Sequence, residues 1–516
     1  MKNPARLTLF LLAAALPIVA LGITPNGDTF AAIQEAINNA GDEGVTLESI
    51  TYHGTGSPIA ISRCMTIYGN GAVLDAQGRS GILEVSPINV SIQDITFKNS
   101  NTNDGGAVYW SGDSGNLSNC TFMNNTASAG GAVYWTGASG SLTNCNFTAN
   151  SATDGGGTVY WTGAFGNLSN CNFTNNTASS CGGAVYWNGA SGHLADCNFT
   201  TNSAGDDAGA VYWNGASGSL TNCNFTANSA ADDGGAVYWN EDAVNGCLAN
   251  CTFAANHADY RAGAVYWNGN TGSLANCSFI DSEAKNFGAV YWIGADGTLT
   301  DSNFTGNNAI LCGAVGWSAR GPGFLSSCAF TNNTATEKGG AVYWDSKYGC
   351  LANSTFIGNN ATEGGAVYWW AAYGTITNAC HFENNTAVEK GGAVYVRRSD
   401  TKISGNCKFV NNSAESGGAL YWQGGSGSLE NCSLTGNTAG GIGGGVYLES
   451  GRELSISGDV SITGNSALKT DGDTQTTVDS NVYLETGGIF AVTGALSGTV
   501  GVTMQTPGVF TENLPG

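Results

Sequence analysis

Two pairs of adjacent carboxylates are the groups in this chain best placed for acid–base chemistry. Asp206 and Asp207 form one pair, and Asp232 and Asp233 form the other. Glycoside hydrolases use two closely placed carboxylates, and lyases use an Arg or Lys base beside acidic calcium ligands. The arginines that could supply such a base occupy unrelated points of the repeat described below: Arg261, Arg320, Arg397 and Arg398. We therefore expect no catalytic residue and no enzyme, with a polysaccharide lyase or glycoside hydrolase as the alternative.

Acidic residues also recur in one turn of the chain. The turn holds Asp104, Asp154, Asp206, Asp207, Asp232 and Asp233, and later Lys338, Glu363 and Lys390. Opposite charges on neighbouring strands stabilise a sheet modestly. The acidic half could attract Ca²⁺ through its oxygen atoms. A solvated acidic edge that keeps the protein soluble is the simpler interpretation, so we expect no metal site.

A row of tyrosines is the candidate ligand-binding surface. Its members are Tyr109, Tyr134, Tyr160, Tyr186, Tyr212 and Tyr238. Alternation along a strand places Val and Trp of the surrounding motif on one face, and Ala and Tyr on the other. With Trp turned inward, the tyrosines line an outer face, where they could stack on a sugar or contact a protein receptor. Plain packing of one strand face on the next is the alternative.

These residues are positioned by a repeat. The string GAVYW, or a close variant of it, recurs in steps of 25 to 28 residues. It begins at Gly106, Gly131, Gly157, Gly183, Gly209, Gly235, Gly263, Gly288, Gly313, Gly340, Gly365, Gly392 and Gly418, with a weaker copy at Gly444. A second motif, Leu-x-Asn-Cys-x-Phe-x-x-Asn-x-Ala, follows most copies, as in 117–127.

Each unit holds three runs of about five residues separated by Gly, Asn, Ser or Asp, which is too short for helices and typical of strands. Units of this length stack into one continuous core. The sequence predicts an all-β fold, a right-handed, single-stranded parallel β-helix with three short strands per coil. About fifteen coils at ~4.8 Å each give a rod roughly 70 Å long.

In-register stacking turns each repeated side chain into a ladder. Cysteine occupies one rung in most units, and Ser302 and Ser354 replace it in two others. This position therefore requires a small buried side chain. The cysteines could be free thiols, or some neighbouring pairs could form disulfides. Asn125, Asn150 and their equivalents are predicted to form an amide ladder. Many neighbouring Asn residues lie in sequons, and exposed ones could be glycosylated.

Composition limits the partners. The chain has 17 Lys and Arg against 39 Asp and Glu, for a net charge of −22. No basic run is present, so nucleic acid and anionic lipid are not expected to bind. No cofactor motif occurs.

The sequence at the two ends of the chain predicts that the protein is exported and that its solenoid is capped. Residues 1–22 have a charged start, an apolar run and a small-residue cleavage site, as in a secretory signal peptide. A segment at 23–59 is expected to cap the stack with a short amphipathic helix from Thr29 to Ala40, started by Asp28. Coils are expected over 60–467, and degenerate coils with a closing cap over 468–516. No later stretch could span a membrane.

The paired motifs resemble a known family. Phe122-x-x-Asn125, Phe147-x-x-Asn150 and Phe330-x-x-Asn333 each lead to Gly-Gly-Ala-Val. This pattern is similar to the FxxN and GGA[ILV] repeats of polymorphic outer membrane proteins, which are adhesins. The resemblance covers roughly 60–490 and implies a pectin-lyase-like β-helix at the cell surface that attaches to cells, host tissue or glycans. Those relatives end in a membrane barrel, for which this sequence has no room, so free secretion or association with another envelope component is expected.

Overall fold

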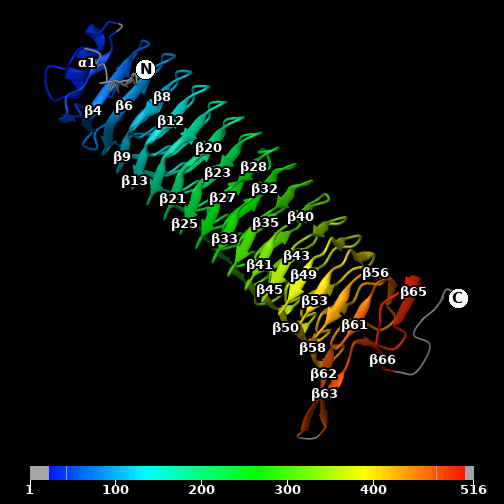
Figure 1. Ribbon diagram of the computed structural model, residues 1–516. Helices are drawn as coiled ribbons and strands as arrows, with labels where there is room; N and C mark the ends of the chain where they lie inside the picture. Colours follow the sequence, from blue (N-terminus) through cyan, green and yellow to red (C-terminus); the bar gives the residue numbers. More distant parts are fainter. Residues whose placement is uncertain (1–21, 42, 472–473, 506–516) are drawn as a thin grey trace, which may run out of the picture.

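The computed structural model describes residues 22–41, 43–471 and 474–505. It is an all-β parallel solenoid of about 16 turns, as the repeat predicts. Figure 1 shows the coils stacked into one rod, with α1 (Phe30–Asn39) at one end and a projecting hairpin, β62 (Ser466–Asp471) and β63 (Thr474–Asp479), near the other. The predicted signal peptide lies outside the described residues, apart from Gly22.

One coil contains four short strand segments that belong to three sheets. The first complete repeat has β7 (Val108–Trp110), β8 (Asn116–Ser118), β9 (Thr121–Met123) and β10 (Thr126–Ala127). The segments β8 and β9 lie in the same sheet, separated by a bend at Asn119, whose φ is 53°. Asn tolerates this left-handed conformation better than most residues, which explains why it precedes the cysteine in so many repeats.

The strands pair parallel and in register from coil to coil. Val108, Tyr109 and Trp110 lie directly beside Val133, Tyr134 and Trp135 of the next coil. The pairing of β9 with β13 (Asn146–Thr148) likewise places Phe122 beside Phe147. Equivalent residues therefore form continuous ladders along the rod, as the sequence predicts.

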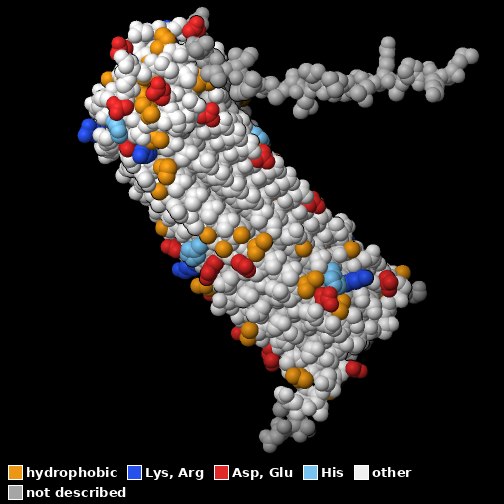
Figure 2. Space-filling view, turned by 60° about the vertical axis from the view of Figure 1, so that its left-hand side comes forward, with side chains coloured by type: hydrophobic (Ala, Val, Ile, Leu, Met, Phe, Trp, Pro, Cys, Tyr) orange, Lys and Arg blue, Asp and Glu red, His pale blue; other side chains and the backbone are white. Residues whose placement is uncertain are grey.

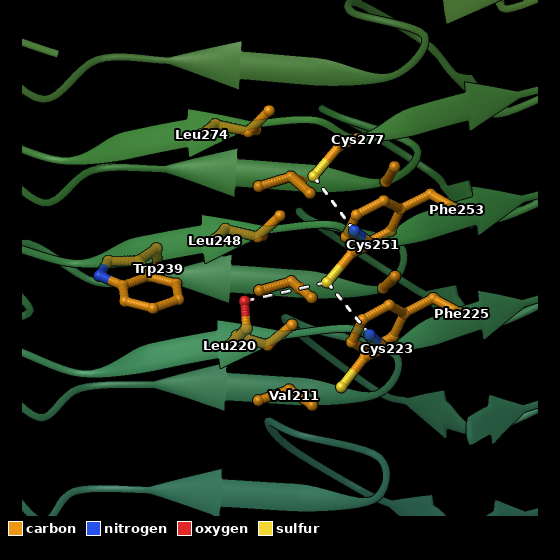
Figure 3. Packing of buried hydrophobic residues seen from close by; sticks show 14 of the residues in the cluster. Val211, Leu220, Cys223, Phe225, Trp239, Leu248, Cys251, Phe253, Leu274 and Cys277 are labelled. Atoms are coloured by element: carbon orange, nitrogen blue, oxygen red, sulfur yellow. Dashed lines mark hydrogen bonds between the residues drawn. The ribbon is translucent and has the colours of Figure 1, made fainter. Parts of the chain in front are cut away.

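The core is filled by the inward side chains of these ladders. Twelve tryptophans are fully buried, with successive ring centroids 4.4 to 5.1 Å apart. Val396 and Leu448 fill the same position where Trp is absent. Figure 3 shows Leu, Phe and Cys ladders stacked within this core. A Cβ on Gly140 would lie 2.3 Å from the indole of Trp135, so the glycine after each Trp provides room for the ring.

The N-terminal cap differs from the prediction in two details. Helix α1 buries Phe30, Ile33 and Ile37 against the stack, as expected, but its N-cap is Thr29, whose hydroxyl accepts a hydrogen bond from the amide of Ala32. Asp28 is therefore not the cap. Strands β1 (Val45–Thr46) and β2 (Thr51–His53) already pair parallel with β4 (Thr66–Asp75), so coil-like pairing begins within 23–59.

The C-terminal end closes the stack with one more coil. The antiparallel hairpin β62–β63 lies at the start of the region 468–516, where degenerate coils were expected. Beyond it, β64 (Val482–Leu484) pairs with β59 (Val446–Leu448), β65 (Ile489–Leu496) with β60 (Glu453–Gly458), and β66 (Val502–Met504) with β64. No helix among the described residues has the length and apolar character needed to cross a bilayer.

Candidate binding surface on the tyrosine sheet

The six predicted tyrosines lie side by side at the centres of consecutive strands. Their strands are β7, β11 (Val133–Trp135), β15 (Val159–Trp161), β19 (Val185–Trp187), β23 (Val211–Trp213) and β27 (Val237–Trp239). Each ring points away from the core that holds the neighbouring Trp. Tyr109 is 36% exposed, and the other five are half-buried. We name this row of Tyr109, Tyr134, Tyr160, Tyr186, Tyr212 and Tyr238 the tyrosine strip.

The rings of the tyrosine strip are stacked at the spacing of the strands. Successive centroids are 4.7 to 5.6 Å apart, and the ring planes lie within 17° of parallel. Each ring is held between its neighbours, so the strip is rigid and loses little conformational entropy when it binds a partner. Figure 2 shows that the middle of one face of the rod carries few charged side chains.

The first ring of the strip borders a hollow. The ladder ends at Tyr109, because Glu84 occupies the equivalent position in the preceding coil. A pocket of about 690 Å³ lies there, lined by Tyr109, Glu84, Asn103 and Asp104 among others. Phenol, amide and carboxylate groups thus converge at this end of the strip, where a ligand could be oriented by hydrogen bonds.

The hydroxyls of Tyr134 and Tyr160 remain protonated at neutral pH. Burial raises the pKa of Tyr134, and the nearby Asp104 raises it further. Burial and the neighbouring Tyr186 and Tyr134 raise the pKa of Tyr160 to about 12. The strip therefore presents hydrogen-bond donors, while Asp104 and Asp154 beside it are exposed carboxylate acceptors.

The tyrosine ladder is interrupted once, and the gap is filled from an adjacent position. Gly316 replaces the tyrosine in β39 (Val315–Trp317), and the ring of Phe287 occupies the space its side chain would fill, 2.1 Å from a Cβ built at Gly316. Phe287 stacks on Tyr291 at 4.1 Å. Sequence reasoning did not identify this exchange, because the two positions differ in the repeat.

Beyond the interruption, four of the tyrosines are buried, and Tyr343 and Tyr483 are half-buried. Tyr368, Tyr395, Tyr421 and Tyr447 are 2 to 6% exposed. The hydroxyl of Tyr421 donates to Glu449 at 2.9 Å, and that of Tyr395 donates to Gln423 at 2.6 Å. The packing interpretation therefore describes this half of the ladder.

The acidic turn differs from the predicted solvated edge at one point. Asp104, Asp154, Asp206 and Asp232 are exposed, but Asp233 is only 7% exposed. Carboxylate oxygens of Asp207, Asp232 and Asp233 lie within 4.8 Å of one another, close enough to share a cation.

A cationic side chain already lies beside this cluster. Arg261 occupies the position of Asp233 one coil later, and its guanidinium nitrogen lies 3.7 Å from an Asp233 carboxylate oxygen. The expectation that Arg261 lies at an unrelated point was therefore wrong. Burial raises the pKa of Asp233 to about 7 against the opposing effect of Arg261, and burial raises the pKa of Asp207 to about 6.

These pKa values predict a pH-dependent stability. An unfolded Asp has a pKa near 3.9, so between about pH 4 and pH 7 the folded state binds the Asp233 proton more tightly than the unfolded state does. Stability therefore falls as the pH rises through this window, by roughly 2–4 kcal/mol at about 1.4 kcal/mol per pKa unit. Asp233→Asn should flatten this dependence in urea unfolding at pH 5 and pH 8. Asp104→Asn, at an exposed position, should retain it, and an unchanged slope in Asp233→Asn would contradict the assignment.

The cysteine ladder is a hydrogen-bonded row of buried thiols. The amide of Cys251 donates to the sulfur of Cys277 at 3.4 Å (Figure 3). The thiol of Cys251 donates to the carbonyl of Ala249 at 3.2 Å. Ser302 makes the same two contacts, accepting from the amide of Cys277 at 3.1 Å and donating to Thr300 at 2.8 Å. Donation needs a protonated group, and burial raises the pKa of Cys328 to about 12.

All sixteen cysteines are free thiols in the structure. Cys64 is exposed, Cys181, Cys247 and Cys350 are intermediate, and the rest are buried. We expect a charged thiol reagent to label Cys64 first in the native protein, and at most those three others slowly. In denaturant without reductant, all sixteen should react. Fewer reactive thiols, missing in pairs, would show that rungs have oxidised to disulfides.

Comparison with known proteins finds a repeat family in this chain. The Chlamydia polymorphic membrane protein repeat matches four segments, 119–134, 170–186, 327–343 and 379–397. No curated protein matches the chain. Among solved structures, a mutant tailspike protein of E. coli bacteriophage HK620, in complex with a hexasaccharide, is 16% identical with a TM-score of 0.28, covering 84% of this chain and 73% of that chain.

Proposed function

We propose that this chain, with its four polymorphic membrane protein repeats on a β-helix, is a non-catalytic, adhesin-like surface rod that contacts a cell-surface glycan or protein receptor through the tyrosine strip. The observation that carries the proposal is the regular row of six tyrosines from Tyr109 to Tyr238, one exposed and five half-buried, stacked at strand spacing beside exposed carboxylates.

The chemistry of the tyrosine strip suits recognition of an extended partner. Tyr combines a large apolar contact area with a hydroxyl donor and has few rotatable bonds, which favours binding surfaces. If a partner makes one contact to each of several coils, the binding energies of these contacts combine. Weak single contacts could therefore give a high overall affinity. The predicted signal peptide at 1–22 would export the chain, and a partner in the envelope could hold it at the surface.

Substitution on the tyrosine strip tests this function. We expect a triple variant, Tyr109→Thr with Tyr160→Thr and Tyr212→Thr, to reduce retention of the purified protein on target cells at least tenfold. Thr favours strands, so the coils should still form, which circular dichroism would verify. Phe165→Asn is the control, because Phe165 is a 65% exposed loop position outside the strip and Asn tolerates its φ of 58°. Equal retention of the triple variant and the wild type would refute the proposal.

A polysaccharide-acting enzyme is the second candidate, because Asp207 and Asp233 have raised pKa values and Arg261 lies beside them. Such shifts are common at catalytic sites. However, Asp233 is 7% exposed, which leaves its carboxyl group little access to a polymer. Incubation with pectin, alginate and host glycans should yield no new reducing or unsaturated ends. Their appearance, and their loss in Asp233→Asn, would favour the enzyme instead.

A further inference from the structure

Three consecutive coils carry an unusual loop after the buried strand. In most repeats this connection is small and polar, as in Asn188-Gly189-Ala190-Ser191-Gly192. It becomes aromatic and charged after β43 (Val342–Trp344), β47 (Val367–Trp369) and β51 (Val394–Val396), which are neighbours in one sheet. The new side chains include Asp345, Lys347, Tyr348, Trp370, Tyr373, Arg398 and Asp400.

The three loops together form a pocket of about 600 Å³. Its lining includes Asp345, Lys347, Trp370, Tyr373, Arg398 and Asp400. Trp370 is partly exposed, whereas the chain's other twelve tryptophans are fully buried. A feature that is absent from the regular coils and concentrated at one point of the rod indicates a local binding function rather than a contribution to the core.

The aromatic rings of Trp370 and Tyr373 line this pocket, and Tyr348 lies beside Tyr373. Tyr348 and Tyr373 stack with their centroids 5.3 Å apart and are 63% and 49% exposed. Phe165 is a single exposed ring at the equivalent loop position of another coil, whereas Tyr348 and Tyr373 lie in adjacent coils and stack on each other. Stacked aromatic rings with open faces bind the apolar faces of pyranose sugars, and they lose little side-chain entropy in doing so.

Cationic groups lie beside the rings. The guanidinium carbons of Arg397 and Arg398 each lie 5.3 Å from the centroid of the Trp370 ring, a cation–π distance. Arg397 also donates to Gln423. Arg398 is exposed and interacts electrostatically with Asp345 across the pocket, but no ion pair within the described part of the chain holds its guanidinium, which can therefore turn to an anionic ligand. In a chain of net charge −22, two basic residues lining one pocket are a local exception.

We propose that this pocket binds an acidic oligosaccharide, in which a pyranose ring stacks on the Tyr348–Tyr373 pair and its carboxylate pairs with Arg398. Trp370 holds the guanidinium in position, Lys347 adds positive charge, and the carboxylates of Asp345 and Asp400 accept hydrogen bonds from sugar hydroxyls. A guanidinium matches a carboxylate in a two-pronged contact. This site shares no residue with the tyrosine strip and does not depend on its function.

Calorimetric titration with paired probes tests the site. Tetragalacturonate and sialyllactose carry the carboxylate, and their methyl esters are the neutral counterparts. We expect at least one acidic probe to bind at least tenfold more tightly than its neutral counterpart. Because the other tryptophans are buried, binding should also change the intrinsic fluorescence, and Trp370→Phe should remove that change.

Variants locate the ligand. Tyr373→Ala and Arg398→Ala should each weaken binding of the acidic probe at least tenfold. Arg398→Ala should also abolish the preference over the neutral counterpart. Arg320→Ala, which changes an exposed arginine in the loop of the preceding coil, should bind as the wild type does. The proposal is overturned if neither acidic probe binds, if neutral counterparts bind equally well, or if Tyr373→Ala and Arg398→Ala bind normally.

Discussion

Replacing Asn228 with Ser should destabilise the rod by roughly 2–5 kcal/mol, and replacing Ser282 with Asn should stabilise it by roughly 1–3 kcal/mol. Asn228 has four side-chain hydrogen bonds: its Nδ2 donates to the carbonyl of Phe199 and to Oδ1 of Asn256, and its Oδ1 accepts from the backbone and side-chain nitrogens of Asn202, all at 3.0 Å. Serine lacks the reach and the second donor, so its neighbours would be left as buried, unsatisfied polar groups.

Ser282 is a natural interruption of the same amide ladder. Its hydroxyl is buried without a hydrogen-bond partner, and Nδ2 of the preceding Asn256 bonds to the carbonyl of Phe225 but not to Ser282. An Asn at 282 would reach Oδ1 of Asn307 and the carbonyl of Phe253, as the Asn at equivalent positions does. Urea unfolding, with hydrogen exchange at the amide of Asn256, measures both variants. A destabilised Ser282→Asn or an unchanged Asn228→Ser would contradict the ladder energetics.

Gly235→Ala should destabilise the rod by about 3 kcal/mol or more, because the added methyl group has no space to enter and the atoms it meets belong to the backbone. A Cβ at Gly235 would lie 2.1 Å from the carbonyl oxygen of Gly263 and 2.4 Å from that of His257. To avoid this clash the two coils would have to move apart. That movement would break the hydrogen bond from the amide of Gly235 to the carbonyl oxygen of Ala262, which is 2.9 Å long.

The matched control is Gly41→Ala, since no atom lies within 4 Å of a Cβ at Gly41. Thermal unfolding and limited proteolysis should show a large loss of stability, and new cleavage near the coil of Gly235, only in the first variant. If Gly235→Ala and the wild type had similar melting temperatures, the backbones of adjacent coils could not be in close contact at Gly235.

The fold was predictable because one repeat specifies it many times. Alternation within GAVYW placed Trp110 in the core and Tyr109 outside, and the structure has both. The bend at Asn119 was not predicted, because a single left-handed residue leaves no change in hydrophobic pattern. The exchange between Phe287 and Gly316 depends on the direction of a side chain, which spacing does not specify.

Two contacts were missed although the register contained them. Alignment of the repeats places Arg261 beside Asp233, one coil apart. It likewise places Arg397 beside Trp370, because Val396 pairs with Trp369. A comparison of the residues at equivalent positions in adjacent coils would have found the Asp233–Arg261 pair and the cation–π contacts of the pocket.

Deletion of whole coils tests most directly the central claim, that equivalent residues stack in parallel along one axis. The positions of Asn172, Asn198, Asn224 and Thr252 are paired in succession, so removal of 172–251 takes out three coils and joins Cys171 to Thr252 in register. Solution X-ray scattering of this variant should show a folded rod shortened by about 14 Å, at ~4.8 Å per coil. Removal of 172–238, which leaves half a coil out of register, should abolish cooperative unfolding. Equal tolerance of both deletions, or an unchanged length after the first, would contradict the account.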